Sequence, residues 1–219
     1  MFMGFLGGTG NEARGLALRF AAAGNPVFLG SRSPERAHRA AEACNLILGA
    51  ASVRGGGNAE MLANSDIVFL TVPFLEAVNA IENYRGQWNS YHILVDVTVP
   101  MTFREGHAEY LEQEGKSNAE IISQNLPGDV SVVAAFKTIP ASLLADLEAP
   151  LDCDVFVCGN SENAKQRVMA AAAGVLSLRP LNSGPLRAAR TLERMAVLAV
   201  ELNRKYRKKS ARYRVAGLD

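Results

Sequence analysis

The chain lacks long hydrophobic runs and any marked excess of one charge. Its 219 residues carry 23 lysines and arginines against 22 aspartates and glutamates, a net charge of +1. We therefore expect neither nucleic acid nor a membrane as a partner, because both attract strongly basic surfaces. No stretch of about 18 apolar residues occurs, so the sequence predicts no transmembrane helix. The first residues, MFMGFLGGTG, also lack the basic and long apolar segments of a signal peptide.

Cysteine and histidine are scarce as well. The three cysteines are irregularly spaced and odd in number, which argues against a disulfide framework or a zinc site; they are Cys44, Cys153 and Cys158. We expect reduced thiols in a cytoplasmic protein without a metal site. The histidines fall in no catalytic pattern, and we expect surface or structural positions for all three: His38, His92 and His107.

Short apolar runs alternate with segments of helical periodicity. The sequence predicts strands at 1–7, 26–30, 52–53, 67–72, 93–99, 130–136, 155–158 and 176–181 and a glycine turn at 55–57. It predicts helices at 11–24, 34–43, 58–63, 75–81, 108–114, 119–126, 162–173 and 186–206. Such alternation is typical of a parallel sheet with crossover helices. We therefore expect an α/β fold: a Rossmann-type, doubly wound, mainly parallel sheet with a small C-terminal helical cap.

A glycine-rich loop joins the first predicted strand to the first predicted helix. Its sequence GTGNEA, residues 8–13, fits the pattern G-x-G-x-x-[GA]. Gly8 permits a tight turn, Gly10 lets backbone N–H groups approach a pyrophosphate, and Ala13 allows the helix to pack closely on the strand. The pattern predicts dinucleotide binding by Gly8, Thr9, Gly10 and Asn11. The alternative is a glycine-rich turn that binds nothing.

The end of the second predicted strand indicates which dinucleotide binds. In this fold that position faces the adenosine ribose, and a carboxylate there selects NAD. This chain has Ser31 and Arg32 instead, with Arg36 one helical turn further on. A hydroxyl and two guanidinium groups suit a 2′-phosphate, so the sequence predicts NADP as the cofactor. The alternative is that the arginines are surface charges.

Four motifs carry a resemblance to a known family. They are GGTGN, then GSR after the second strand, LTVPF, and KTIPASLL after the sixth strand. Together with the ending RVAGL at 214–218, they make the chain resemble the coenzyme F420-dependent NADP oxidoreductases over nearly its whole length. The resemblance implies hydride transfer between NADPH and the 5-deazaflavin F420, with the two rings stacked in one cleft. Such a transfer depends mainly on proximity and ring orientation.

The resemblance also implies a set of binding residues. The glycine loop, Ser31, Arg32 and Arg36 match the NADP-binding positions. The segment that flanks the NADP ring region is matched by Val72, Pro73 and Phe74. The segment that contacts the deazaflavin is matched by Lys137, Ile139, Pro140 and Ala141. The C-terminal residues that would close this side are Gly217 and Leu218.

Lys137 departs from the relatives, which often carry His or Asn at this position. A lysine can donate a hydrogen bond to a ring carbonyl or hold an anionic ring system, which would preserve deazaflavin binding. It could instead be catalytic, as the proton donor to a substrate carbonyl, or be a mere surface lysine. Two other functions therefore stay open. One is a related NADPH-dependent reductase acting on a flavin, a pterin or a small carbonyl compound, and the other is a regulatory module that only binds NADP.

The resemblance suggests how the chain is divided. We expect an NADP-binding Rossmann domain at 1–154, and at 155–219 an extension that packs on the same core and completes the cleft for the second cofactor. The last predicted helix is apolar on more than one side, which suggests a homodimer or a helix buried within its own chain. The basic run at 203–214 is either a solvated helix end or a patch for an anion.

Overall fold

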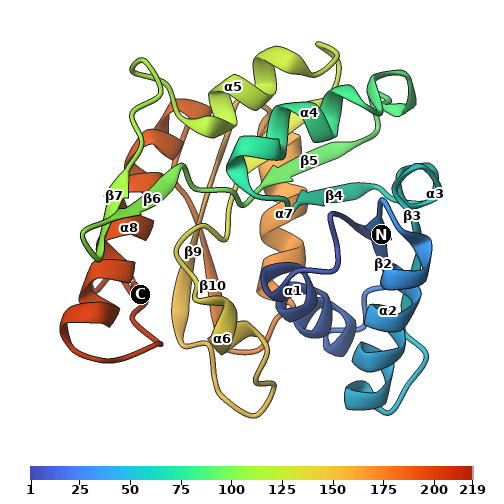
Figure 1. Ribbon diagram of the computed structural model, residues 1–219, viewed down its shortest axis with the longest axis horizontal. Helices are drawn as coiled ribbons and strands as arrows, with labels where there is room; N and C mark the ends of the chain where they lie inside the picture. Colours follow the sequence, from blue (N-terminus) through green and yellow to red (C-terminus); the bar gives the residue numbers. More distant parts are fainter. Residues whose placement is uncertain (219) are drawn as a thin grey trace.

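The structure, a computed structural model, describes residues 1–218 and is built around one eight-stranded sheet. Helices cover both faces of this sheet (Figure 1). The first part of the chain forms β1 (Met3–Leu6), α1 (Asn11–Ala22), β2 (Val27–Ser31), α2 (Pro34–Leu48), β3 (Val53–Gly57), α3 (Asn58–Ala63), β4 (Ile67–Leu70), α4 (Ala77–Glu82) and β5 (Ile93–Asp96). The second part forms β6 (Met101–Arg104), β7 (His107–Tyr110), α5 (Asn118–Asn125), β8 (Ser131–Ala134), α6 (Ala141–Leu144), β9 (Cys153–Gly159), α7 (Glu162–Ala173), β10 (Leu178–Asn182) and α8 (Ala189–Lys205).

The strand order confirms the predicted Rossmann-type sheet. It runs β10-β9-β8-β5-β4-β1-β2-β3, and every neighbouring pair is parallel except β8 and β9. The chain moves outward from β1 through β2 to β3, then returns to place β4 on the other side of β1. Ligands bind at such a reversal, outside the carboxyl ends of the strands. The loops after β1 and β4 are therefore expected to frame the binding site.

Side chains alternate between two cores, one on each face of the sheet. In β4, for example, Ile67 and Phe69 join the core formed with α1, α2 and α7, whereas Val68 and Leu70 join the core formed with α3, α4, α5 and α8. A strand buried on both faces needs apolar residues at every position, which explains its unbroken apolar sequence. The aromatic ring of Phe69 stacks on Phe5 of β1 with centroids 4.8 Å apart.

The prediction of a helix at 108–114 is wrong. Residues of that segment form β7, which pairs antiparallel with β6 and places Arg104 opposite His107. Glu105 and Gly106 make the turn with φ values of 48° and 80°, and two consecutive positive φ values match the twist of a tight hairpin. The hairpin lies against α8, and this tertiary contact overrides the helical tendency of the segment.

The glycines at 55–57, predicted as a turn, form the end of β3 instead. A Cβ atom on Gly55 would fall on the backbone carbonyl of Ala37 in α2. Glycine is therefore needed there because helix and strand approach each other more closely than a side chain allows. The other predicted strands and helices are present with shifted ends, and α2 extends to Leu48 rather than residue 43.

Candidate functional site

Most of the predicted NADP-binding residues meet in one cavity of about 530 Å³ at the reversal of strand order. The cavity lies between the glycine loop after β1, the end of β2 and the segment after β4. Its lining includes seven residues singled out from the sequence: Thr9, Gly10, Ser31, Arg32, Arg36, Val72 and Pro73.

The glycine loop has the geometry of a pyrophosphate cradle. Gly7 has a φ of 85°, which favours glycine. Gly8 lies so close to β2 that an added Cβ would come within 3.0 Å of the Leu29 Cα atom. Gly10 precedes α1, and no side chain caps the helix there. The N–H groups of its first turn therefore remain available to an anion.

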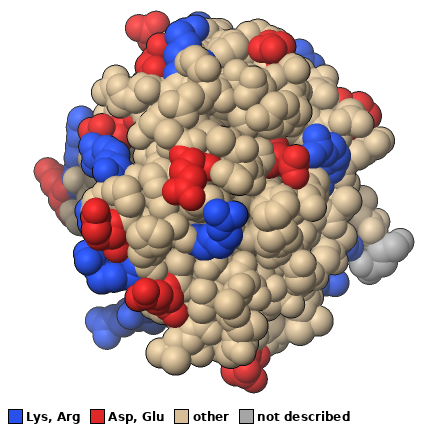
Figure 2. All heavy atoms as spheres, turned by 90° about the vertical axis from the view of Figure 1, so that its right-hand side faces the viewer, with Lys and Arg blue, Asp and Glu red and all other residues tan. Residues whose placement is uncertain are grey.

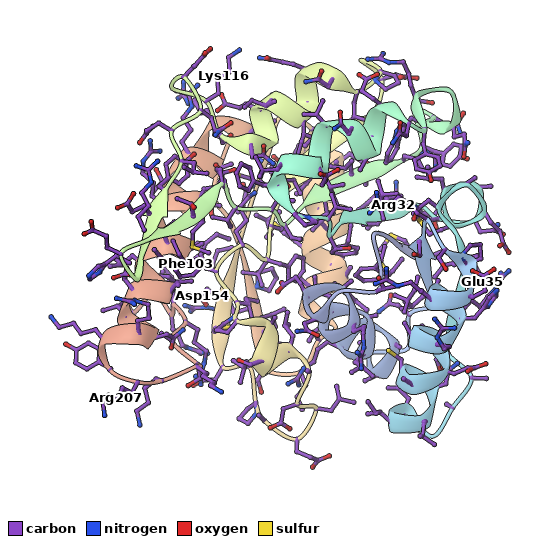
Figure 3. All side chains as sticks on the ribbon, viewed as in Figure 1. Arg32, Glu35, Phe103, Lys116, Asp154 and Arg207 are labelled. Carbon is purple, nitrogen blue, oxygen red and sulfur yellow. The ribbon has the colours of Figure 1, made fainter. Side chains whose placement is uncertain are left out.

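Arg32 and Arg36 form the candidate 2′-phosphate site. Both side chains are exposed and line the cavity, and neither makes a hydrogen bond or ion pair within residues 1–218. Ser31 is buried at the end of β2, where its Oγ accepts a hydrogen bond from the Ser33 backbone N–H at 3.2 Å. Figure 3 labels Arg32 on the side of the molecule that carries α2. Two unpaired guanidinium groups at this edge suit a phosphate dianion.

Asn58 and Tyr84 are cavity residues that the sequence reasoning missed. Asn58 is buried at the start of α3, and its Nδ2 donates to the Tyr84 hydroxyl at 3.2 Å. Its Oδ1 is buried without a partner in the described part of the chain. Gly30 makes room for it, since a Cβ there would lie 2.7 Å from Oδ1. The one sequence signal was an asparagine directly after a strand of the sheet.

These features fit NADP. A buried carbonyl oxygen without a donor is costly unless a ligand supplies one, and a dinucleotide carries hydroxyl and amino donors. The uncapped helix and the two free arginines supply the complementary groups for its pyrophosphate and 2′-phosphate.

A second cavity of about 420 Å³ continues from the first. The two share Gly10, Thr71, Val72 and Pro73. The second cavity extends across the carboxyl ends of β5 and β8, where its lining includes four further predicted residues: Asn11, Phe74, Lys137 and Ile139. A ligand in one cavity would therefore lie directly beside a ligand in the other.

Lys137, predicted as a catalytic or ring-binding residue, is fully engaged by the protein. Its Nζ lies 2.6 Å from Asp96 Oδ2, 2.5 Å from the Thr98 carbonyl oxygen and 3.2 Å from Glu193 Oε1. The side chain is only 1% exposed. An ammonium group has three N–H donors, and three acceptors surround this one. A hydrogen bond from Lys137 to a ring carbonyl would require breaking one of these contacts.

The network around Lys137 joins β5, the segment after β8, and α8. Glu193 of α8 also accepts hydrogen bonds from the Tyr110 hydroxyl at 2.9 Å and from the Asn118 backbone N–H at 3.0 Å. Burial opposes the charge on Lys137, but the carboxylates of Asp96 and Glu193 outweigh it and raise the Lys137 pKa. Burial raises the Glu193 pKa as well. The lysine is therefore held protonated, as the cation of a buried ion-pair network.

The C-terminal segment lies beside the start of β9. The Asp154 backbone N–H donates to the Tyr213 carbonyl at 2.9 Å, and the Val215 N–H donates to Asp154 Oδ2 at 2.6 Å. A third, small hollow of about 130 Å³, to which Pro140 contributes, lies between the segment after β8 and α8. Four of the predicted residues line none of these three cavities: Gly8, Ala141, Gly217 and Leu218.

Within residues 1–218, none of the helices could span a membrane, and no three His, Cys, Asp or Glu side chains gather as a metal site. All three cysteines are buried free thiols. His92 is buried and bonds the Leu62 carbonyl, whereas His107 is exposed beside Glu201.

The fold and the paired cavities define the class of Rossmann-type, NADP-dependent oxidoreductases. Comparisons with known proteins agree. The family model for coenzyme F420-dependent NADP oxidoreductase matches residues 3–100. The F420-dependent NADP reductase of Methanocaldococcus jannaschii is 33% identical over 225 residues, covering 100% of both chains. That of Methanothermobacter thermautotrophicus is 34% identical over 223 residues, covering 100% of this chain and 96% of the relative.

A solved structure supports the fold. A crystal structure provisionally described as an F420-dependent NADP reductase of Arthrobacter sp. FB24 superposes with a TM-score of 0.82 at 22% identity, covering 98% of each chain. The chain belongs to the F420-dependent NADP reductase family.

Proposed function

We propose that this protein transfers a hydride between NADPH and the 5-deazaflavin coenzyme F420. The observation that carries the proposal is the continuity of the two cavities through Gly10, Thr71, Val72 and Pro73. When both substrates are bound, the dihydronicotinamide supplies the hydride and the deazaflavin accepts it. The protein's main contribution is to hold two rings face to face with water excluded.

The first cavity is assigned to NADPH. The glycine loop, with Thr9 and Asn11, would bind the pyrophosphate through backbone N–H groups. Ser31, Arg32 and Arg36 would hold the 2′-phosphate. The nicotinamide would then reach the wall shared by the two cavities, which Val72 and Pro73 line, with Phe74 next to it in the second cavity.

The second cavity is assigned to the deazaflavin. Phe74 and Ile139 give it apolar walls, and Pro140 and Ala141 would continue the contact toward α8. In this proposal residues 1–154 bind NADP and residues 155–219 complete the acceptor side, with Gly217 and Leu218 closing it. Support comes from the position of the C-terminal segment, which lies beside the first residues of β9. Because β9 runs antiparallel to β8, these residues lie at the carboxyl edge of the parallel strands.

The alternative acceptors are less well supported. The hypothesis that a small carbonyl compound is reduced used Lys137 as the proton donor. The N–H donors of Lys137 are all engaged within the protein. A module that only binds NADP would need a blocked second half of the cleft, but a cavity of about 420 Å³ lies there. Flavins and pterins stay open as rival acceptors.

An absorbance assay tests the proposal. Purified protein is mixed with NADPH and oxidised F420, and bleaching of the deazaflavin is followed. Rapid bleaching with NADPH but not with NADH is the expected result. Tight NADPH binding in a parallel titration, with no bleaching, would reject F420 as the acceptor and direct the search to flavins and pterins.

We also propose a homodimer in the cytoplasm. The dimer is supported by large apolar side chains exposed near α8: Phe103 on β6 is 59% exposed, and Leu198 and Leu202 on α8 are 52% and 36% exposed. Figure 3 labels Phe103 away from Arg32, and the strand β7 that pairs with β6 packs on α8. The cytoplasmic location is supported by three buried thiols that are not paired in disulfides.

A further inference from the structure

One acidic side chain of the second cavity has no part in the assignments above. Glu12 lies within the glycine pattern, in the first turn of α1, and shares the cavity with Phe74, Phe136 and Ile139. Its side chain is partly exposed to the cavity. Within residues 1–218 it makes no hydrogen bond and no ion pair. A carboxyl group without a protein partner thus lines the cavity assigned to the deazaflavin, next to Gly10 of the wall shared with the first cavity.

The surroundings of Glu12 favour its neutral form. Burial among the cavity walls raises the pKa of the Glu12 carboxyl to about 8, and no neighbouring cation opposes this effect. At neutral pH the group therefore keeps its proton and is a donor. Bound substrates would cover the cavity further and strengthen the effect of burial.

Few other titratable groups face Glu12. The segments after β4 and β5 contribute only uncharged residues to the cavity, and the segment after β8 contributes Lys137. The ammonium of Lys137 is held by Asp96 and Glu193, neither of which lines the cavity. Arg14, on the same helix as Glu12, lines a different hollow with Arg36 and Arg39. Glu12 is therefore the group of this cavity able to release a proton near neutral pH.

We propose that Glu12 is the acid–base residue of the reaction, a proposal that rests on the function proposed above. Reduction of the acceptor ring needs a proton in addition to the hydride. The C–H bond of the dihydronicotinamide breaks, and its electron pair forms a C–H bond on the deazaflavin. The O–H bond of Glu12 breaks, and its proton forms an N–H bond on the deazaflavin ring. NADPH is oxidised, the deazaflavin gains two electrons, and Glu12 is left as a carboxylate.

The positive charge that appears on the nicotinamide assists the proton transfer. An adjacent cation lowers the pKa of a carboxyl group, so hydride departure makes Glu12 a stronger acid at the moment the proton is needed. The carboxylate then faces the oxidised nicotinamide and stabilises it. A proton from solvent restores Glu12 after the products leave, and the reverse reaction starts from the carboxylate.

The first test compares the wild type with Glu12→Gln in both directions of hydride transfer. For the wild type we expect F420 reduction to fall as the pH rises past the Glu12 pKa and the reverse reaction to rise. Glu12→Gln should lower the rate by about 10²- to 10⁴-fold and remove this ionisation from the profile. NADPH affinity should stay nearly unchanged. Glu42→Gln, the same change at an exposed residue of α2, is the matched control.

A second test needs no substrate. At pH values between the pKa of Glu12 in the unfolded state, about 4.3, and its pKa in the folded state, only the folded protein keeps this proton. Unfolding in this pH range therefore releases it. The wild type should therefore lose stability relative to Glu12→Gln as the pH rises from 5 to about 8, with a constant difference at higher pH. Thermal unfolding of both proteins over this range measures the difference in Tm.

The outcomes separate this proposal from the proposed function. Equal pH profiles of F420 reduction in the wild type and Glu12→Gln would overturn the role of Glu12 alone. A Tm difference that does not change between pH 5 and 9 would overturn its neutral state. A wild type that binds NADPH but never reduces F420 would overturn the proposed function and this proposal with it.

Discussion

Arg32 is the residue on which cofactor choice is expected to depend most. Its guanidinium lines the first cavity without any partner in the described chain. A hydrogen bond to a charged group is worth about 1.5–3 kcal/mol, so Arg32→Ala should weaken NADPH binding about 10- to 150-fold. NADH binding should change little, because NADH has no 2′-phosphate. Titrations of both nucleotides measure this, with Arg187→Ala, an exposed arginine outside this cavity, as the control.

The opposite result is equally informative. Equal losses of NADPH and NADH affinity in Arg32→Ala would mean that the side chain supports the shape of the cavity rather than the phosphate. Arg36→Ala then becomes the next variant to compare, since Arg36 is the other unpaired cation of the same cavity.

Individual residues also show which parts of the site a sequence can predict. The place of Arg32 in the cavity was predictable because the residue directly follows a strand of the sheet, while its role in binding a phosphate stays a prediction. Asn58 was not, because its importance comes from an unpaired oxygen that exists only once Gly30 and Tyr84 surround it. Glu12 lies within the glycine pattern itself, but its pKa depends on walls contributed by segments after β4, β5 and β8. Such properties belong to the packed cavity.

At the scale of elements, the contact between α2 and β3 depends on a missing side chain. Gly55→Ala would place a methyl group on the Ala37 carbonyl, and because both partners are backbone, one element must move. We expect a loss of about 1–3 kcal/mol in the free energy of unfolding. Gly57→Ala is the matched control, since its methyl would meet only the Pro34 side chain at 3.9 Å. Denaturant unfolding measures both, and similar stability of the two variants would disprove the explanation.

Elements were predictable where the local pattern and the tertiary environment agree. The strands buried on both faces were found from apolar runs alone. The hairpin β6–β7 was not, because its turn uses Glu105 and Gly106 rather than the more recognisable Asn-Gly or Asp-Gly pair, and because its packing on α8 is remote in sequence. Likewise, α6 is a short helix whose terminal carbonyls of Leu143 and Leu144 accept hydrogen bonds from the distant Arg19.

The ion-pair network of Lys137 connects three elements, and its loss should be costly. Lys137→Met leaves the carboxylates of Asp96 and Glu193 buried without a cation. Removing one partner of a buried pair costs about 3–5 kcal/mol. Adding Asp96→Asn should restore part of the stability, because less buried charge is then unpaired. Lys116→Met, at an exposed lysine (Figure 3), is the control.

Substrate binding distinguishes this structural role from a direct one. Lys137 does not line the first cavity, which is proposed to bind NADPH, so a folded Lys137→Met variant should keep its NADPH affinity. If Lys137→Met is as stable as the wild type but loses deazaflavin binding, the ammonium is a ligand-binding group rather than part of the framework.

At the scale of the whole molecule, charge offers little guidance to partners. Figure 2 shows the side of the molecule that carries α2 and β3, where acidic and basic side chains are interspersed rather than gathered by sign. The net charge of +1 gives the whole chain no general attraction to partners of either sign. An association of copies is therefore expected to depend on apolar contact, and the candidates are the exposed side chains near α8.

Leu198 provides the test of that association. It is a large apolar residue, 52% exposed on α8, and a dimer interface would cover it. Leu198→Glu would bury a carboxylate in such an interface, so it should convert the dimer to monomers while leaving the fold intact. Light scattering measures the mass against a single 23.5 kDa chain. Leu46→Glu makes the same change at a residue 85% exposed on α2 and should leave the mass unchanged. A wild type that is monomeric at assay concentrations would reject the dimer. The exposed apolar residues of α8 would then have to be covered by a different partner.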